Sequence, residues 1–357
     1  MSSDQDKILK CQKNLLIIPE YFDNPVLDAL FYMSYYYSLV HLYLLMIFTI
    51  VDFLSNILIV FVLSQPELRS SGINLAMILI AICNFSSILM TFAQNYLEDV
   101  NGPRKTFAMA VYCWVEIYFN TLLPAMSNYL VVEMAFCRVM ALFSNRSHVW
   151  NGINRVARMS LFLLISVGLS SSIVIPMIGV KWDDLAESYI TTLADAYIEN
   201  ECIMFRAMLF YIGFVFGALP CVFNLVFFVL ILWKIKQSKA HRTKMFSLRN
   251  IQSMDRSSRL LQVILVMFLV AKVPEAAISI FSAFYLLDYI IFIGPMCSDF
   301  IDILSVINAS ASFIIYCSMS SAFRSVFFRM LVPEYFRRRF EKSRMQITVV
   351  ATTRMAA

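Results

Sequence analysis

Seven long apolar segments constrain the fold of this 357-residue chain more than any other feature of its sequence. Each holds about 20 or more mostly apolar residues, the length that a helix needs to cross roughly 30 Å of hydrocarbon. Backbone polar groups find no water in lipid, so such segments are stable there as helices. The sequence therefore predicts an all-α, seven-transmembrane helix bundle with spans near 38–64, 73–96, 107–142, 157–180, 205–233, 260–286 and 297–319.

Composition agrees with this class and excludes others. Charged residues make up 15% of the chain, whereas a soluble domain carries roughly 25%. The 31 Phe and 17 Tyr argue against a disordered chain, which lacks apolar side chains to bury. We expect three parts: an extracellular N-terminal segment (1–37), the bundle (38–319), and a cytoplasmic amphipathic helix with a basic tail (320–357).

The distribution of charge predicts the orientation. With the charged helix ends included, the connectors after the first, third and fifth spans and the C-terminal tail hold 21 Lys and Arg against 4 Asp and Glu. Basic connectors stay on the cytoplasmic side of a membrane, so the N-terminus is expected outside the cell and the protein in the plasma membrane. The segment 234–259 is the most basic connector, which suits anionic lipid or a cytoplasmic partner.

The segment after the last span has the pattern of an amphipathic helix. Phe323, Val326, Phe327 and Met330 recur at helical spacing, and basic residues follow on the polar positions. This pattern predicts a juxtamembrane helix, an eighth helix lying on the inner membrane surface and contacting membrane lipid.

Several motifs resemble those of the rhodopsin-like G-protein-coupled receptors. Span 1 has a Ser-Asn pair at 55–56, span 3 ends in Phe-Cys-Arg-Val at 136–139, and prolines at 220 and 274 occupy the expected places in spans 5 and 6. Span 7 ends in a stretch similar to Asn-Pro-x-x-Tyr followed by Phe-Arg. The stretch 69–84 resembles the entry to span 2 of the nematode Srw chemoreceptors, relatives of FMRFamide-type peptide receptors.

The resemblance implies a function. Such a receptor binds an extracellular peptide or small-molecule ligand and activates a heterotrimeric G protein in the cytoplasm. It further implies that switching and coupling involve Arg138 and Tyr316 at the inner end and Phe268 in span 6. Lys272 stands where the family has a tryptophan, and Cys137 stands where an acidic residue precedes the arginine. Loss of that acid predicts raised basal activity.

Ionisable residues within the spans are candidates for the ligand site, because charge inside a bilayer is costly. They form three pairs at helical spacing on spans 3, 6 and 7, which converge on one pocket in the resembled fold: Glu116 and Asn120, Lys272 and Glu275, Asp299 and Asp302. Carboxylates outnumber the lysine, and the outer loop adds further acids, so a cationic ligand is expected. Lys272 can pair with Glu275 on its own helix or across to Asp302, and a salt bridge that only fixes helix packing is the alternative to a ligand site.

A second polar group lies deeper in the spans. Asp52 and Asn56 are four residues apart on one face of span 1, and Asn84 and Asn308 should approach them. We hypothesise that Asp52 supplies the carboxylate that Asn84 lacks, in a hydrated core that lets helices slide between two states. A purely structural hydrogen-bond network is the alternative.

Four cysteines are expected on the outer side, where disulfides persist: Cys11, Cys113, Cys202 and Cys297. They allow three pairings. The resemblance implies a bond between Cys113 and Cys202, which would leave Cys11 to pair with Cys297 or remain free.

Other function classes receive little support. The three histidines are dispersed and no P-loop or nucleophile elbow is present, so we expect no metal site, no cofactor, no enzyme activity and no nucleic-acid partner. The rival function is a small-solute transporter or channel that uses the charges within the spans. The absence of internal repeats and the presence of only 8 glycines favour a receptor. A Gly-x-x-x-Gly pair at 213 and 217 indicates close packing or, more weakly, dimerisation.

Overall fold

The computed structural model describes residues 25–101, 106–144, 147–150, 152–184, 187–242 and 249–331. Within them, seven helical stretches are long and apolar enough to cross a membrane, which confirms the predicted bundle. They are formed by α2 (Pro25–Leu63), α3 (Gly72–Asn101), α4 (Phe107–Phe143), α6 (Ile153–Ser171), α7 (Asp195–Tyr211) continued by α8 (Leu219–Arg242), α9 (Arg249–Phe284) and α11 (Gly294–Met319).

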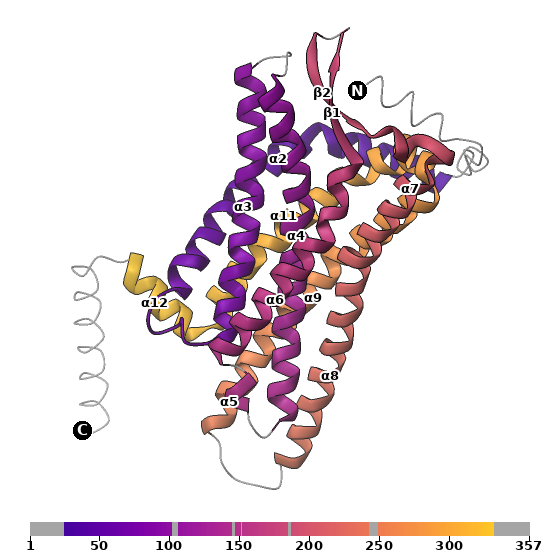
Figure 1. Cartoon of the computed structure of the whole chain (residues 1–357). Coiled ribbons are helices and arrows are strands. Elements are labelled where there is room, and N and C mark those ends of the chain that lie inside the picture. The colour runs from indigo at the N-terminus through magenta and orange to yellow at the C-terminus, as the bar shows by residue number, and fades with distance from the viewer. Residues whose placement is uncertain are drawn as a thin grey trace, which may run out of the picture.

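Helix α4 lies at the centre of the bundle (Figure 1). About 61% of its most apolar stretch is buried inside the protein, against 22–28% in the other six spans. It packs against α3, α6 and α8, while α2 packs against α3 and α11. The remaining surface of the outer helices is rich in exposed Leu, Ile, Val and Phe, as expected where lipid replaces water.

The fifth span is not a regular α-helix throughout. Between α7 and α8 lies a π-helical stretch, η3 (Ile212–Ala218), which packs against α9. A Cβ atom added at Gly213 would lie 3.0 Å from the Cβ atom of Ser279, and one at Gly217 would lie 3.0 Å from that of Ala276. The two glycines therefore serve close packing within the bundle, the first of the two uses that the sequence suggested.

A β-hairpin follows the fourth span and was not predicted. The fourth helical stretch, ending in η2 (Ser172–Met177), stops before the expected boundary at residue 180, and β1 (Ile178–Asp183) pairs antiparallel with β2 (Ser188–Leu193). β2 carries β-branched and aromatic side chains, which favour strands. The hairpin projects from one end of the bundle and contacts α4 (Figure 1).

The helix of the first membrane span begins earlier than expected. Helix α2 starts at Pro25, so part of the segment 1–37 continues the first span rather than preceding it. Residues 25–37 are mostly apolar and aromatic, which suits a helix that continues into the first span.

Helix α12 (Ser321–Leu331) forms where an amphipathic helix was predicted, at the end of the bundle opposite the hairpin (Figure 1). Phe323 is fully buried, with its ring 5.5 Å from that of Tyr316, and Val326 is also buried. Part of its apolar face therefore packs on the bundle. Arg329 pairs with Glu67 of the connector after α2 at 2.5 Å, and this hydrogen bond raises the pKa of the arginine. The basic cluster at 337–339 lies outside the described residues.

Three short helical elements complete the structure: α5 (Ser147–Trp150), α10 (Leu286–Asp288) and the π-helical η4 (Tyr289–Ile293). The last two form the connector between α9 and α11, near the end of the bundle that carries the hairpin.

Candidate functional site

Glu116 and Asn120 of α4 form one pair of the candidate ligand site. They are separated by about one helical turn, so their side chains lie on the same face. The Asn120 amide donates a hydrogen bond of 3.0 Å from Nδ2 to Oε1 of Glu116. Glu116 is buried, so this contact holds a carboxylate inside the bundle.

Lys272 and Glu275 form the second pair, and a third residue joins them. Lys272 Nζ lies 2.6 Å from Glu275 Oε2 and 3.3 Å from Ser305 Oγ. The Ser305 hydroxyl in turn donates to Glu275 Oε2 at 3.1 Å. Lys272 and Glu275 belong to α9 and Ser305 to α11, so this triad ties the sixth span to the seventh. Ser305 was not among the predicted site residues.

Two of the three predicted pairs meet around one cavity. A cavity of about 140 Å³, here called the Asn120 cavity, lies between α4, η3 and α9. Asn120, Lys272 and Glu275 line it, together with Asn128 and Ser279 among others. Glu116 reaches it through its hydrogen bond to Asn120. The cavity is smaller than the roughly 300–1,000 Å³ of pockets that enclose a drug-sized ligand, so it admits only part of such a molecule.

The third pair is directed elsewhere. Asp299 Oδ1 lies 3.7 Å from Nε2 of His41 on α2, and His41 Nδ1 lies 3.2 Å from the Tyr37 hydroxyl. Asp302 is exposed and does not line the Asn120 cavity. The structure thus brings Asp299 to the first span, and Lys272 pairs with Glu275 rather than with Asp302. His41 and Tyr37 were missed because their role depends on how α2 and α11 are rotated against each other.

The deeper polar residues converge on a second cavity. A cavity of about 180 Å³, here called the Asp52 cavity, is lined by Asp52, Asn84, Phe268 and Asn308 among others. Asn56 donates from Nδ2 to Asp52 Oδ1 at 2.5 Å. On the opposite wall, Ser127 of α4 donates to Asn84 Oδ1 at 3.1 Å. Asp52 therefore presents a carboxylate to the two asparagines that the sequence associated with it.

Lys272 belongs to both cavities. It lines the Asp52 cavity as well as the Asn120 cavity, as do Pro124 and Asn128 of α4. Asn128, which was not predicted, donates from Nδ2 to the carbonyl of Phe216 in η3 at 3.1 Å. The sequence could have indicated Asn128, because an amide within an apolar span is costly unless it finds a hydrogen-bond partner. The two cavities therefore share three lining residues, of which Lys272 and Asn128 are polar.

At the opposite end of the bundle, the predicted coupling residues are buried. Arg138 and Cys137 of α4 and Tyr316 of α11 lie inside the helix bundle. Glu133, one turn earlier on α4, accepts hydrogen bonds of 2.9 and 3.2 Å from the Ser160 hydroxyl of α6. Its carboxylate therefore serves the contact between the third and fourth spans.

The disulfide bonding in the structure differs from the pairing that the family resemblance implied. Cys202 is disulfide-bonded, whereas Cys113 and Cys297 carry thiols. The structure therefore contains neither a Cys113–Cys202 nor a Cys11–Cys297 bond, and Cys11 itself lies outside the described residues. Cys113 and Cys202 are not joined to each other because Cys202 lies in α7. This helix packs against α9, whereas the hairpin, not α7, covers the start of α4.

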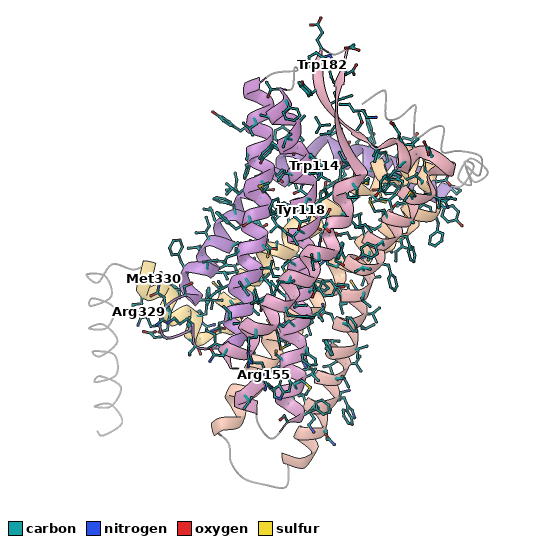
Figure 2. The ribbon with its side chains drawn as sticks, viewed as in Figure 1. Trp114, Tyr118, Arg155, Trp182, Arg329 and Met330 are labelled. Carbon is teal, nitrogen blue, oxygen red and sulfur yellow. The ribbon has the colours of Figure 1, made fainter. Side chains whose placement is uncertain are left out.

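The hairpin forms an aromatic and charged surface above α4. Trp182 and Tyr189 pack edge to face across the two strands, with ring centroids 4.9 Å apart. Lys181 pairs with Asp195 at 2.9 Å, both well exposed. Trp182 lies at one end of the molecule and Arg155 towards the other (Figure 2).

Two comparisons with known proteins agree with this architecture. The profile of a family described as "Serpentine type 7TM GPCR chemoreceptor Srw" matches residues 43–333. A protein of Caenorhabditis elegans named "G-protein coupled receptor dmsr-1" is 22% identical over 382 aligned residues, which cover 91% of this chain and 74% of the relative. The match extends over all seven helical spans and the beginning of the C-terminal segment.

Proposed function

Because the chain belongs to the serpentine type 7TM GPCR chemoreceptor Srw family, we propose that it binds a cationic extracellular ligand and activates a heterotrimeric G protein. The ligand is a basic neuropeptide or a cationic chemosensory cue. The observation that carries this proposal is the Asn120 cavity, in which Glu275 and Lys272 of one span face Asn120 of another, and Asn120 is hydrogen-bonded to the buried Glu116.

The size of the cavity favours a peptide. A space of about 140 Å³ admits one side chain or a small amine, while the rest of a larger ligand would contact the hairpin and the outer helix ends. A basic side chain entering this space would interact with Glu116 and Glu275, and would compete with Lys272 for the latter. Such competition is a direct way for ligand binding to alter the contact between α9 and α11.

The orientation follows from charge. The basic connectors and α12 share the end opposite the hairpin, which supports an extracellular N-terminus and a hairpin end on the outer side of the plasma membrane. Ligand binding at that end must then shift an equilibrium between two states of the bundle, and the ligand must bind one state more tightly. Lys272, which lines both cavities, is the proposed link to Asp52 and its asparagines.

At the cytoplasmic end, Arg138 and Tyr316 are the proposed contacts for the G protein. Both are buried in this structure, so coupling requires that α9 moves away from them. Asn56, Asn84, Phe268 and Asn308 belong to the proposed switch.

The test is a G-protein activation assay in cells that express the full chain, screened first with basic amidated peptides. Once a ligand is found, Glu116→Gln is compared with Asp183→Asn, which removes an acid from the hairpin. We expect Glu116→Gln to reduce potency more. Equal losses would mean that the acids only attract the ligand over a distance. Ligand-dependent solute flux without nucleotide exchange would refute receptor function and favour a transporter or channel.

A further inference from the structure

A wide groove opens on the membrane-facing side of the bundle and shares no lining residue with either polar cavity. It has a volume of about 770 Å³ and lies between α4, α6 and α8, next to α5. Its walls are apolar and aromatic, formed by Val132, Phe136, Met159, Leu163, Phe223 and Phe227. Phe162 at its edge is 69% exposed and Phe223 is 40% exposed, so the described part of the chain leaves this groove open to the bilayer.

One end of the groove is cationic. Arg155 and Arg158, which lie near the beginning of α6, both line it. The Arg155 guanidinium carbon lies 4.2 Å from the ring centroid of Trp150, and Arg158 Nε donates to the Asn154 carbonyl at 3.2 Å. These contacts orient two guanidinium groups at the depth where α6 enters the membrane. Figure 2 places Arg155 at the end of the bundle opposite Trp182.

The aromatic wall is ordered by its own packing. The rings of Phe136 and Trp150 meet edge to face at 5.9 Å, and Phe136 also packs against Phe227 at 5.9 Å. Phe227 stacks on Phe223 at 6.4 Å. A row of rings that leads from two arginines into the hydrocarbon matches a molecule with an anionic head and an apolar tail.

Glu133 determines which end of the groove receives the anion. It also lines the groove, and its buried carboxylate accepts both hydrogen bonds from Ser160. Ser160 lies five residues beyond Arg155 on α6, roughly 7.5 Å along the helix axis. A phosphate would be repelled near Glu133 and attracted at the arginines, so the head group belongs at the end where α6 begins.

We propose that this groove binds an anionic phospholipid from the leaflet that borders the α12 end of the bundle. The phosphate contacts Arg155 and Arg158, because guanidinium groups match phosphate oxygens with paired N–H donors. One acyl chain lies along Phe136 and Phe227. Basic pockets between membrane helices are suited to anionic head groups, and this one adds an apolar channel for the chain. The proposal does not depend on the ligand or on G-protein coupling.

The test measures lipid retained by the purified full chain. The protein is exchanged into detergent with equal amounts of phosphatidylserine and phosphatidylcholine, and bound lipid is counted by native mass spectrometry. We expect preferential retention of phosphatidylserine. The double variant Arg155→Gln/Arg158→Gln should lower its affinity roughly thirtyfold, since each basic residue at a membrane surface contributes on the order of fivefold.

Matched variants separate a specific site from general attraction. Arg69→Gln/Lys236→Gln removes the same charge from exposed positions at the same end of the protein and should leave retention unchanged. Leu163→Trp fills the groove and should lower retention of phosphatidylserine while the arginines remain. Arg158→Lys keeps the charge but loses the paired N–H donors, so it should lower the affinity less than Arg158→Gln does. A thermal unfolding measurement of the double variant checks that it is folded.

Three results would overturn the proposal. Equal retention of the two lipids would mean that a neutral molecule or ordinary bilayer lipid fills the groove. Equal losses in the two double variants would reduce the effect to overall charge. Unchanged retention in Leu163→Trp would show that no acyl chain lies in the groove.

Discussion

Lys272 Nζ lies 2.6 Å from Glu275 Oε2, and this pair is placed where the Asn120 cavity meets the Asp52 cavity. A lysine at this depth is costly without a partner, and its pairing with Glu275 and Ser305 satisfies the charge while joining α9 to α11. The contact therefore has a structural consequence, which the first prediction tests, as well as a proposed role in signalling.

Glu275→Gln should destabilise the protein by on the order of 1 kcal/mol, because it leaves the Lys272 ammonium mostly buried without its carboxylate. The Glu275 side chain is 34% exposed, so water limits the loss. The double variant Lys272→Met/Glu275→Gln should be less destabilised than the sum of the single variants, measured by thermal unfolding in detergent. Additive losses would mean that the pair is not coupled.

Asp52→Asn should reduce the maximal ligand response while leaving surface expression intact. The substitution keeps the shape of the side chain and its contact with Asn56, but removes the negative charge that faces Asn84 and Asn308 across the Asp52 cavity. The control is Ser55→Ala, which removes only a hydroxyl bonded to the Asp52 carbonyl. An unaltered response in Asp52→Asn would leave these residues with a structural role alone.

Cys137→Asp should lower basal activity. The wild-type chain has no acidic residue directly before Arg138, so the resting state lacks one restraint and its basal activity should be measurable. Because Cys137 is buried, the variant is compared with Cys137→Asn, which has a similar size and no charge. A silent wild-type receptor in a basal nucleotide-exchange assay, at confirmed surface expression, would contradict this prediction.

Gly213→Ala should destabilise the bundle by about 1–3 kcal/mol, because its new Cβ atom would lie 3.0 Å from atoms of Ser279 in α9. Gly168→Ala is the matched control, since the nearest atom to its Cβ is the Tyr118 hydroxyl oxygen at 3.8 Å. The readout is the unfolding temperature at constant protein concentration. If Gly213→Ala instead changed only the oligomeric state, the glycine pair would serve dimerisation rather than packing within the chain.

Cys202→Ser should lower stability by about 2–4 kcal/mol, whereas Cys113→Ser should have a much smaller effect. Peptide mapping without reduction identifies the fragment joined to the Cys202 peptide. Recovery of a fragment that contains Cys113 would restore the pairing that the family resemblance implied and would contradict this structure.

The sequence by itself determined the architecture. Apolar segments of sufficient length can satisfy their backbone in a membrane only as helices, so seven spans follow from local composition without any tertiary contact. The spacing of Glu116 with Asn120, and of Lys272 with Glu275, likewise follows from helix geometry alone, since residues three or four apart share a face. These two contacts were predictable for that reason.

Tertiary structure decided everything that depends on how one helix is rotated against another. The pairing of Asp299 with His41, the addition of Ser305 to the lysine pair and the contact of Glu133 with Ser160 each join different helices. No periodicity within a single span contains that information. The bonding of Cys202 belongs to the same class, because it depends on which element covers the start of α4. Local composition specifies the helices, and the packing of their side chains specifies the site.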